Sequence, residues 1–179
     1  MTENDAPMGQ SMISANNSGQ EQLDNFIKLA KTFETAMLVT YSDSDQMHAR
    51  PMSIAELRDD ATVRFVTNAQ SLKASEIAAD SQVGLVFQGG GTYLAARGRA
   101  TVDHDQALID RLWQEPWRIW FPQGKQQSDL RIITVTLHDA EYWDNSGIEG
   151  IKYAFSLAKA YGTGTRPHVS DSQHGKVQT

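Results

Sequence analysis

Residues 65–79 read FVTNAQSLKASEIAA, and the rest of the chain is best interpreted from this stretch. Phe65 and Val66 favour a β-strand, and the polar residues that follow them end it. Ser71 is a suitable N-cap for a helix, whose apolar positions follow an i, i+3, i+4 spacing at Ala74, Ile77 and Ala78. The stretch therefore predicts a strand, a tight turn and a helix.

A junction of this kind can hold an anion, because the first N–H groups of a helix are free and lie at the positive end of its dipole. Lys73 adds a positive charge just past the cap, and Thr67 and Ser71 add hydroxyl donors. Two interpretations stay open at this point. The turn is either a site for a phosphate monoester or an ordinary strand-to-helix turn with a solvated lysine.

The bulk composition excludes several classes of protein. With 179 residues the chain is expected to form one domain with one core. Its net charge of −6 argues against sequence-independent nucleic-acid binding, which needs a basic face. There is no cysteine, so disulfides and zinc–cysteine sites are excluded. No apolar run is long enough for a membrane helix and no signal pattern is found, so we expect a cytoplasmic protein without a membrane partner.

Six segments have the composition of β-strands, and hairpin-length connections make the first three antiparallel. Pro51 interrupts the second, which predicts an edge or a bend, and Gly98 predicts a bend or bulge in the fifth. The fold class is therefore mainly β with flanking helices, arranged as a six-stranded antiparallel barrel. The predicted strands are 36–41, 47–57, 63–67, 82–88, 92–102 and 130–143.

Helical spacing of apolar residues appears around these strands, at 21–34, 71–79, 105–121 and 148–161. Pro116 lies inside the third of these helices and is expected to split it. Three divisions of the chain follow from composition. Residues 1–20 are a disordered leader, residues 21–161 form the domain, and residues 162–179 form a polar tail.

Two further features bear on a binding site. Hairpin pairing brings Arg50 near the turn that carries Lys73, and arginine and lysine together suit phosphate oxygens. The alternative is a surface salt bridge for Arg50. An aromatic set could offer flat walls to a planar cofactor, or could be core or subunit contact: Tyr93, Trp113, Trp117, Trp120 and Trp143. His48 has no second ligand at a suitable spacing, and we predict no metal site.

The order of these segments and their motifs resembles one family. The chain is similar to the FMN-binding split-barrel proteins related to pyridoxamine 5'-phosphate oxidase, and most of all to their general-stress-protein branch. The resemblance covers about residues 22–145. It rests on AMLVTY, HARPMSIAEL, VRFVTNAQSLKASEIAADSQVGLVF and TYLAARGRATV, followed by the WFPQG and AEYWD segments.

This resemblance implies a homodimer of split barrels that binds FMN, with FAD as a second candidate. Arg50 and Lys73 would hold the phosphate, assisted by Thr67 and Ser71. The rest of the implied contacts are to the flavin ring: the backbone of Pro51, Met52 and Ser53, the side chains of Val66 and Tyr93, and an aromatic residue of the partner subunit taken from Trp120 and Phe121.

The implied activity is that of a flavin-dependent oxidoreductase-like protein with a stress-related role. Leu72 replaces an arginine that the oxidases carry beside the lysine, and Arg166–Pro167–His168 lies in the predicted tail. True pyridoxamine 5'-phosphate oxidase activity is therefore not expected, and no catalytic side chain or substrate is identified. The alternatives are a flavin carrier or sensor without turnover and a split barrel that binds no flavin.

Overall fold

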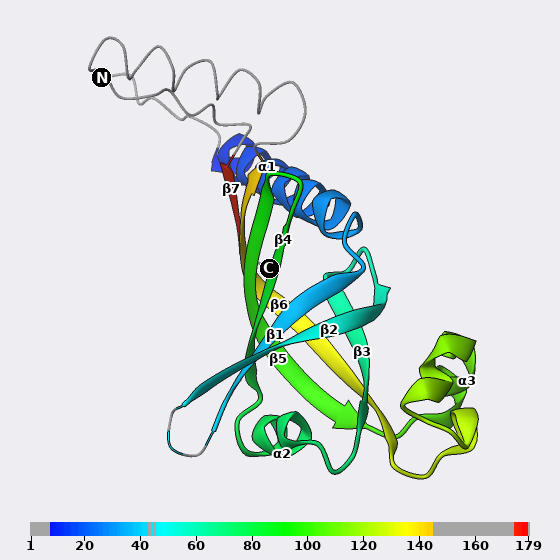
Figure 1. Cartoon of the computed structure of the whole chain (residues 1–179). Coiled ribbons are helices and arrows are strands. Elements are labelled where there is room, and N and C mark those ends of the chain that lie inside the picture. The colour runs from blue at the N-terminus through cyan, green and yellow to red at the C-terminus, as the bar shows by residue number, and fades with distance from the viewer. Residues whose placement is uncertain (1–7, 43, 45, 145–173, 179) are drawn as a thin grey trace, which may run out of the picture.

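The computed structural model describes residues 8–42, 44, 46–144 and 174–178. Six antiparallel strands form a barrel in the order β3-β2-β1-β4-β5-β6, and pairing of β3 with β6 closes it (Figure 1). The predicted fold class is confirmed. The barrel strands are β1 (Thr35–Tyr41), β2 (Met47–Leu57), β3 (Thr62–Asn68), β4 (Gln82–Gly89), β5 (Thr92–Asp103) and β6 (Leu130–Asp144).

Alternation of side chains explains why these segments are strands. In β3 every second residue is buried, and Val63 and Phe65 are fully enclosed in the barrel. The same period places the inward residues of the other strands in one core, which includes Leu38, Leu85, Phe87, Leu94, Ile133 and Val135. Closure leaves these six strands with little exposed ladder edge.

The barrel is open at one place, between the ends of β2 and β3. Residues 47–53 of β2 pair with β1 but not with β3, since the β2–β3 ladder begins only at Ile54, opposite Phe65. Pro51 lies in this one-sided segment, where a missing ladder donor is tolerated, as predicted. Beyond Phe65, β3 continues beside β6, so the ends of β2 and β3 separate.

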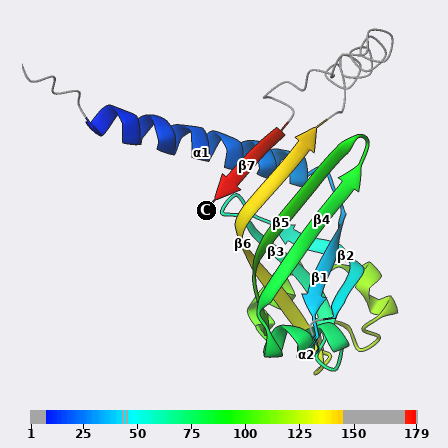
Figure 2. The ribbon, with the colours of Figure 1, turned by 90° about the vertical axis from the view of Figure 1, so that its left-hand side faces the viewer.

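Helices close the two ends of the barrel. The helix α1 (Met8–Ala30) covers the end formed by the β4–β5 turn and extends well beyond it, whereas α2 (Leu72–Ala79) lies at the opposite end (Figures 1 and 2). Phe26, Ile27 and Ala30 bury the inward face of α1. Beside the barrel lie α3 (Gln106–Leu112) and two 3-10 helices, η1 (Glu115–Ile119) and η2 (Gly124–Gln126).

The irregularity predicted at Gly98 is present, but the bulge is in β6, opposite Gly98, and not in β5. The β5–β6 register shifts between Arg97 and Gly98, so His138 is an extra residue in β6. A Cβ atom on Gly98 would clash with the carbonyl oxygen of Thr136 and lie 2.9 Å from its carbonyl carbon. Only glycine permits this close approach of the two backbones.

The ends of the chain differ from the sequence prediction. The helix α1 begins at Met8, within the predicted leader; Pro7 directly precedes it and no proline interrupts it. A seventh strand, β7 (His174–Gln178), lies in the predicted polar tail and pairs with the outer end of β6. Its one large apolar residue, Val177, is 3% exposed, so pairing with β6 outweighs a polar composition. The predicted helix 148–161 lies outside the described residues, and the domain limits stay predictions.

No helix in the described parts of the chain combines the length and the apolar character that a bilayer crossing requires.

Candidate functional site

A cavity of about 290 Å³ lies where β2 and β3 separate. Three elements of the barrel and its cap contribute to it, together with the aromatic residues around η1. Its lining residues are Pro51, Met52, Ser53, Val66, Thr67, Lys73, Trp117, Trp120 and Phe121. Eight of the eleven residues predicted for the cofactor are in this set; Arg50, Ser71 and Tyr93 are not.

The turn before α2 has the predicted form. Ser71 is the N-cap residue of α2, with extended backbone, but its hydroxyl does not cap the helix. It lies 3.0 Å from the hydroxyl of Thr67, which is buried at the cavity. Asp129 holds the turn from outside, because its carboxylate accepts from the Asn68 amide at 2.5 Å and its carbonyl accepts from Ala69 N–H at 2.7 Å.

Lys73 is the one lysine that lines this cavity, and it is partly buried. Among the described residues no hydrogen bond or ion pair involves its ammonium group. Burial lowers the pKa of Lys73, the nearby charge of Arg50 lowers it further, and Glu76 raises it in part. The charged lysine is thus held at a site that an anion would stabilise.

Arg50 is close enough to influence Lys73, but its hydrogen bonds are made to other groups. Its Nη1 donates to Thr40 Oγ1 at 2.5 Å and to the Leu38 carbonyl at 3.5 Å, and its Nη2 donates to Glu76 Oε2 at 2.9 Å. The prediction of Arg50 as a phosphate ligand stays a prediction. What the structure adds is a buried carboxylate behind it.

Glu76 is a feature that the sequence analysis missed. Its carboxylate is 4% exposed and accepts hydrogen bonds from Thr40, His48 and Arg50. Burial alone would raise the pKa of Glu76, but these three hydrogen bonds outweigh burial and lower it. The helix face was predicted as Ala74, Ile77 and Ala78; Ala78 is in fact exposed and Glu76 takes the inward position.

A signal for Glu76 was available in the sequence. His48 and Arg50 are two residues apart, so on a strand they share one face, and Thr40 lies opposite His48 in the β1–β2 ladder. A carboxylate on a helix packed over that face is the partner that these donors require.

The aromatic wall comes from the predicted split helix. Pro116 lies in η1, separated from α3 by a break after Leu112, as expected. Trp117 and Phe121 are buried at 8% and 6% exposure, whereas Trp120 is 67% exposed. Trp113 does not line the cavity, but its ring packs edge to face on Trp117 at 5.9 Å. All of these aromatic residues belong to the same chain as Lys73, whereas the resemblance implied that the partner subunit provides Trp120 or Phe121.

Tyr93 is not brought to the cavity within one chain. It lies at the β4–β5 turn, opposite Gln88 and Trp143, and is 45% exposed. The cavity is at the other end of β5, since Val66 pairs with Ile132 and Ile132 pairs with Asp103. Ten strand residues separate the two places, roughly 33 Å. Any contact of Tyr93 with a ligand in this cavity would require a second copy of the chain.

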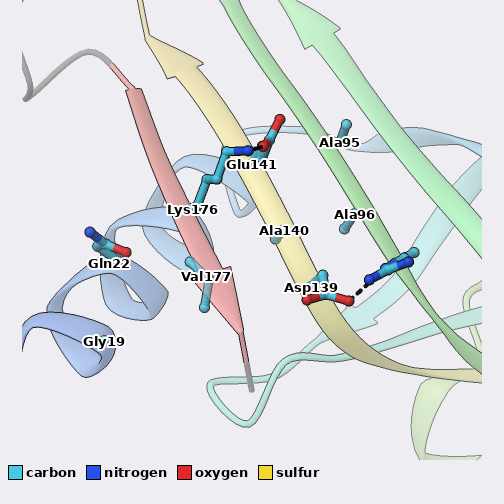
Figure 3. A pocket seen from close by; sticks show the side chains of 10 residues that line it. Gly19, Gln22, Ala95, Ala96, Asp139, Ala140, Glu141, Lys176 and Val177 are labelled. Carbon is cyan, nitrogen blue, oxygen red and sulfur yellow. Dashed lines mark hydrogen bonds and ion pairs between the residues drawn. The ribbon is translucent and has the colours of Figure 1, made fainter. Parts of the chain in front are cut away.

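A second cavity, larger than this one, lies away from the predicted site. It measures about 820 Å³ and lies over β5, β6 and β7 beside α1. Figure 3 shows Ala95, Ala96 and Ala140 among its lining residues, with an ion pair between Lys176 and Glu141 and another between Arg97 and Asp139. No predicted cofactor residue lines it. In the described part of the chain, no three side chains of His, Asp or Glu gather as a metal site.

Comparison with known proteins supports the resemblance. Residues 21–168 match the family model described as "Pyridoxamine 5'-phosphate oxidase like", and the chain belongs to this family. No curated protein matches it.

Solved structures with the same fold include three general stress proteins. A general stress FMN/FAD binding protein from Xanthomonas citri is 24% identical, with a TM-score of 0.62 over 72% of this chain and 92% of that one. A protein provisionally assigned to a general stress family, from Xanthomonas campestris pv. campestris, is 27% identical, with a TM-score of 0.61 over 72% and 90%. General Stress Protein 26 from Bacillus anthracis is 19% identical, with a TM-score of 0.58 over 69% and 92%.

Proposed function

We propose that the cavity between β2, β3, α2 and η1 binds FMN. One arrangement carries the proposal: a partly buried lysine without a described partner and a set of flat apolar side chains line the same cavity. A phosphate group compensates the lysine, and an isoalloxazine ring matches aromatic and proline walls. The name of the Xanthomonas citri relative, an FMN/FAD binding protein, supports a flavin ligand.

A single phosphate fits better than the diphosphate of FAD. Lys73 is the one cationic side chain that lines the cavity, and Leu72 beside it is 62% exposed and apolar. Thr67 and Ser71 supply hydroxyl groups next to Lys73, together with the first N–H groups of α2. A second phosphate would find no further positive charge among the lining residues.

When bound, the flavin supplies the electron transfer. The chain's own residues bind and orient it: Lys73 holds the phosphate, residues 51–53 and Val66 lie along the ring, and Trp120 covers it. Trp117 and Phe121 line the same cavity as buried apolar side chains and keep water out. We therefore propose a flavin-dependent oxidoreductase-like protein with a stress-related role, and the absence of cysteine is compatible with a cytoplasmic location.

A carrier or sensor function is the second candidate, and one observation favours it. Ser53, Thr67 and Lys73 are the polar side chains of the lining, and none of them is a histidine or a carboxylate that could transfer a proton at neutral pH. Reduction by NADH or NADPH separates the two functions. Steady turnover would support the oxidoreductase, and a flavin that is bound but not reduced would support the carrier or sensor.

The protein is further proposed to be a homodimer. Of the nine large apolar side chains that are exposed in the described residues, six lie on the outer face of the sheet: Met37, Tyr41, Met47, Val86, Tyr93 and Trp143. Exposed large apolar side chains gathered on one face of a sheet are typical of a subunit interface. The face runs into the cavity at Pro51, which pairs with Met37, and it carries Tyr93, so a second copy would add Tyr93 to the site.

The test is spectroscopic. We expect the purified protein to show flavin absorption bands, and the flavin released by heating to have the mass of FMN. After removal of the flavin, titration with FMN should quench flavin fluorescence, and riboflavin should bind more weakly because it lacks the phosphate. Colourless protein that also leaves the fluorescence of added FMN unchanged would overturn the proposal.

A further inference from the structure

Three hydrogen bonds connect the side chains of Arg50, Thr40 and Glu76 in a closed ring next to the cavity. Arg50 donates from Nη1 to Thr40 Oγ1 at 2.5 Å and from Nη2 to Glu76 Oε2 at 2.9 Å. Thr40 in turn donates its hydroxyl hydrogen to the same Glu76 Oε2, at 2.5 Å. Thr40 is completely buried and Glu76 is 4% exposed, so the ring excludes water.

The ring uses one particular edge of the guanidinium group. A guanidinium has five N–H donors in a planar fork, and its end-on edge consists of Nη1 and Nη2. Thr40 and Glu76 occupy that end-on edge. The side-on edge consists of Nε and the second N–H of Nη2, and these donate to no described atom.

The side-on edge is also accessible. Among the described residues, Arg64 Nε is the one side-chain nitrogen or oxygen atom that is both buried and without a hydrogen-bond partner. Arg50 Nε has no partner either, so it is not a buried atom. Arg50 as a whole retains 22% exposure of its side chain. The Arg50 side chain thus reaches solvent over part of its surface, and its charge is close enough to Lys73 to lower the pKa of that residue.

From this geometry we infer that Thr40 and Glu76 are positioning residues for the phosphate site. They hold the end-on edge of Arg50, so that its side-on edge and the ammonium group of Lys73 serve the same phosphate group. This inference rests on the proposed binding of FMN and adds the residues that set the direction of the second cation. Side-on pairing of arginine with an oxyanion is bidentate, which favours phosphate over a neutral group.

Glu76 has an electrostatic part in the same arrangement. Two cations at one place repel each other, and Arg50 lowers the pKa of Lys73. The ionised carboxylate of Glu76 offsets one of these charges while no ligand is bound, and His48 donates to its other oxygen from Nδ1. Both cations can then stay in position before the phosphate arrives, which is preorganisation of the site.

The experiment compares Thr40→Val with Thr40→Ser. Valine keeps the shape of threonine and removes the hydroxyl that links Arg50 to Glu76, whereas serine keeps the hydroxyl and loses a methyl group. The measured quantity is the ratio of the dissociation constants of riboflavin and FMN, which isolates the contribution of the phosphate. We expect Thr40→Val to lower this ratio about tenfold, the effect of one charge-assisted hydrogen bond, and Thr40→Ser to preserve it.

If Thr40 had a merely structural role, Thr40→Val would weaken the binding of riboflavin and of FMN equally. The ratio of their dissociation constants would then stay unchanged, which would overturn the inference. Glu76→Gln provides an independent variant, because it keeps the shape of the side chain and removes its charge; we expect the ratio to fall here as well, and a ratio equal to that of the unmodified protein would count against positioning by Glu76. Failure of the proposed function looks different, since the unmodified protein would then show no preference for FMN over riboflavin.

Discussion

Arg111 on α3 donates hydrogen bonds from both Nη atoms to the carboxylate of Glu56 on β2, at 2.5 and 3.1 Å. Arg64 on β3 donates to the same carboxylate from the other side. Because α3 leads into η1, this bidentate pair links the aromatic wall of the cavity to β2, the strand that forms its opposite wall. The cavity is thus held together by an interaction that does not line it.

Replacing this carboxylate should destabilise the protein in a pH-dependent way. Hydrogen bonds from Arg111 and Arg64 lower the pKa of Glu56 to about 2, from an ordinary value of 4.5. A lowered folded-state pKa gives stability that is present above the unfolded-state value and is lost as the pH falls toward about 2. We expect Glu56→Gln to cost about 1–3 kcal/mol at pH 7, and less at pH 3.

Urea unfolding at several pH values measures this effect. Glu21→Gln is a matched control, because Glu21 is exposed on α1 and no ion pair to it is found among the described residues. A cost of Glu56→Gln that stays the same from pH 7 to pH 3 would contradict the ionic role of Glu56.

Lys73 should show opposite effects on stability and on binding. Burial and Arg50 lower its pKa, so the charged form is disfavoured in the folded protein without ligand. We expect Lys73→Met to leave the melting temperature of the flavin-free protein unchanged or higher, and to remove most of the increase that FMN produces. Thermal unfolding with and without FMN tests this, with Lys28→Met, at an exposed position of α1, as the control. A variant whose stabilisation by FMN equals that of the unmodified protein would remove Lys73 from the site.

The parts of this fold that could be predicted are those set by neighbouring residues. Strand-forming composition indicated six strands, Pro116 split a helix, Ser71 began another, and Gly98 lies opposite the bulge. Each depends on a local rule about backbone conformation or side-chain period. The turn with Lys73 has a local signature and hairpin pairing brought Arg50 near it, whereas residues 51–53 were assigned to the site by the family resemblance.

Features that depend on distant partners could not be predicted in the same way. Glu76 is inward because Thr40, His48 and Arg50 from two other elements meet it; the signal for it lies in those strands and not in the helix sequence. Strand β7 has one large apolar residue and forms because β6 offers it a free edge. Tyr93 was assigned to the site by residue type and by resemblance, and the fold places it at the far end of β5.

Gly98 tests the bulge directly. The Cβ atom of an alanine there would lie 3.0 Å from Leu137 Cα and would also clash with Thr136 backbone, which cannot move without breaking the ladder. We expect Gly98→Ala to destabilise the protein by about 1–3 kcal/mol. Gly19→Ala is the matched control: Gly19 lies in α1, and a Cβ atom added there would have nothing within 4 Å, so this change should stabilise by up to about 1 kcal/mol. Equal effects of the two changes in chemical denaturation would refute the close approach at the bulge.

The proposed dimer predicts a strong effect at the centre of the apolar face. Val86 is 40% exposed and lies between Met37 and Ala95 in neighbouring strands. Val86→Lys would bury a charge in the interface, so we expect a monomer in sedimentation at micromolar concentration, where the unmodified protein is a dimer. Ile119→Lys makes the same change at a 77% exposed residue away from this face and should leave the mass unchanged. A monomeric unmodified protein would disprove the dimer.

Trp120 offers the most specific test of how the flavin lies in the cavity. Its side chain lines the cavity and is 67% exposed, so it has a free face that a flavin ring could cover. Stacking of an aromatic side chain contributes about 0.5–1.5 kcal/mol beyond the area that it buries. We expect Trp120→Ala to weaken the binding of FMN and of riboflavin by the same factor, because the ring is common to both.

Lys73→Ala should instead weaken the binding of FMN by about 1–3 kcal/mol and leave the binding of riboflavin nearly unchanged. Ile119→Ala, one residue away in η1 and outside the cavity lining, is the control and should alter neither. If Trp120→Ala reduced only the binding of FMN, or if Ile119→Ala matched its effect, the ring would not lie against Trp120, and the orientation of the flavin proposed for this cavity would be wrong.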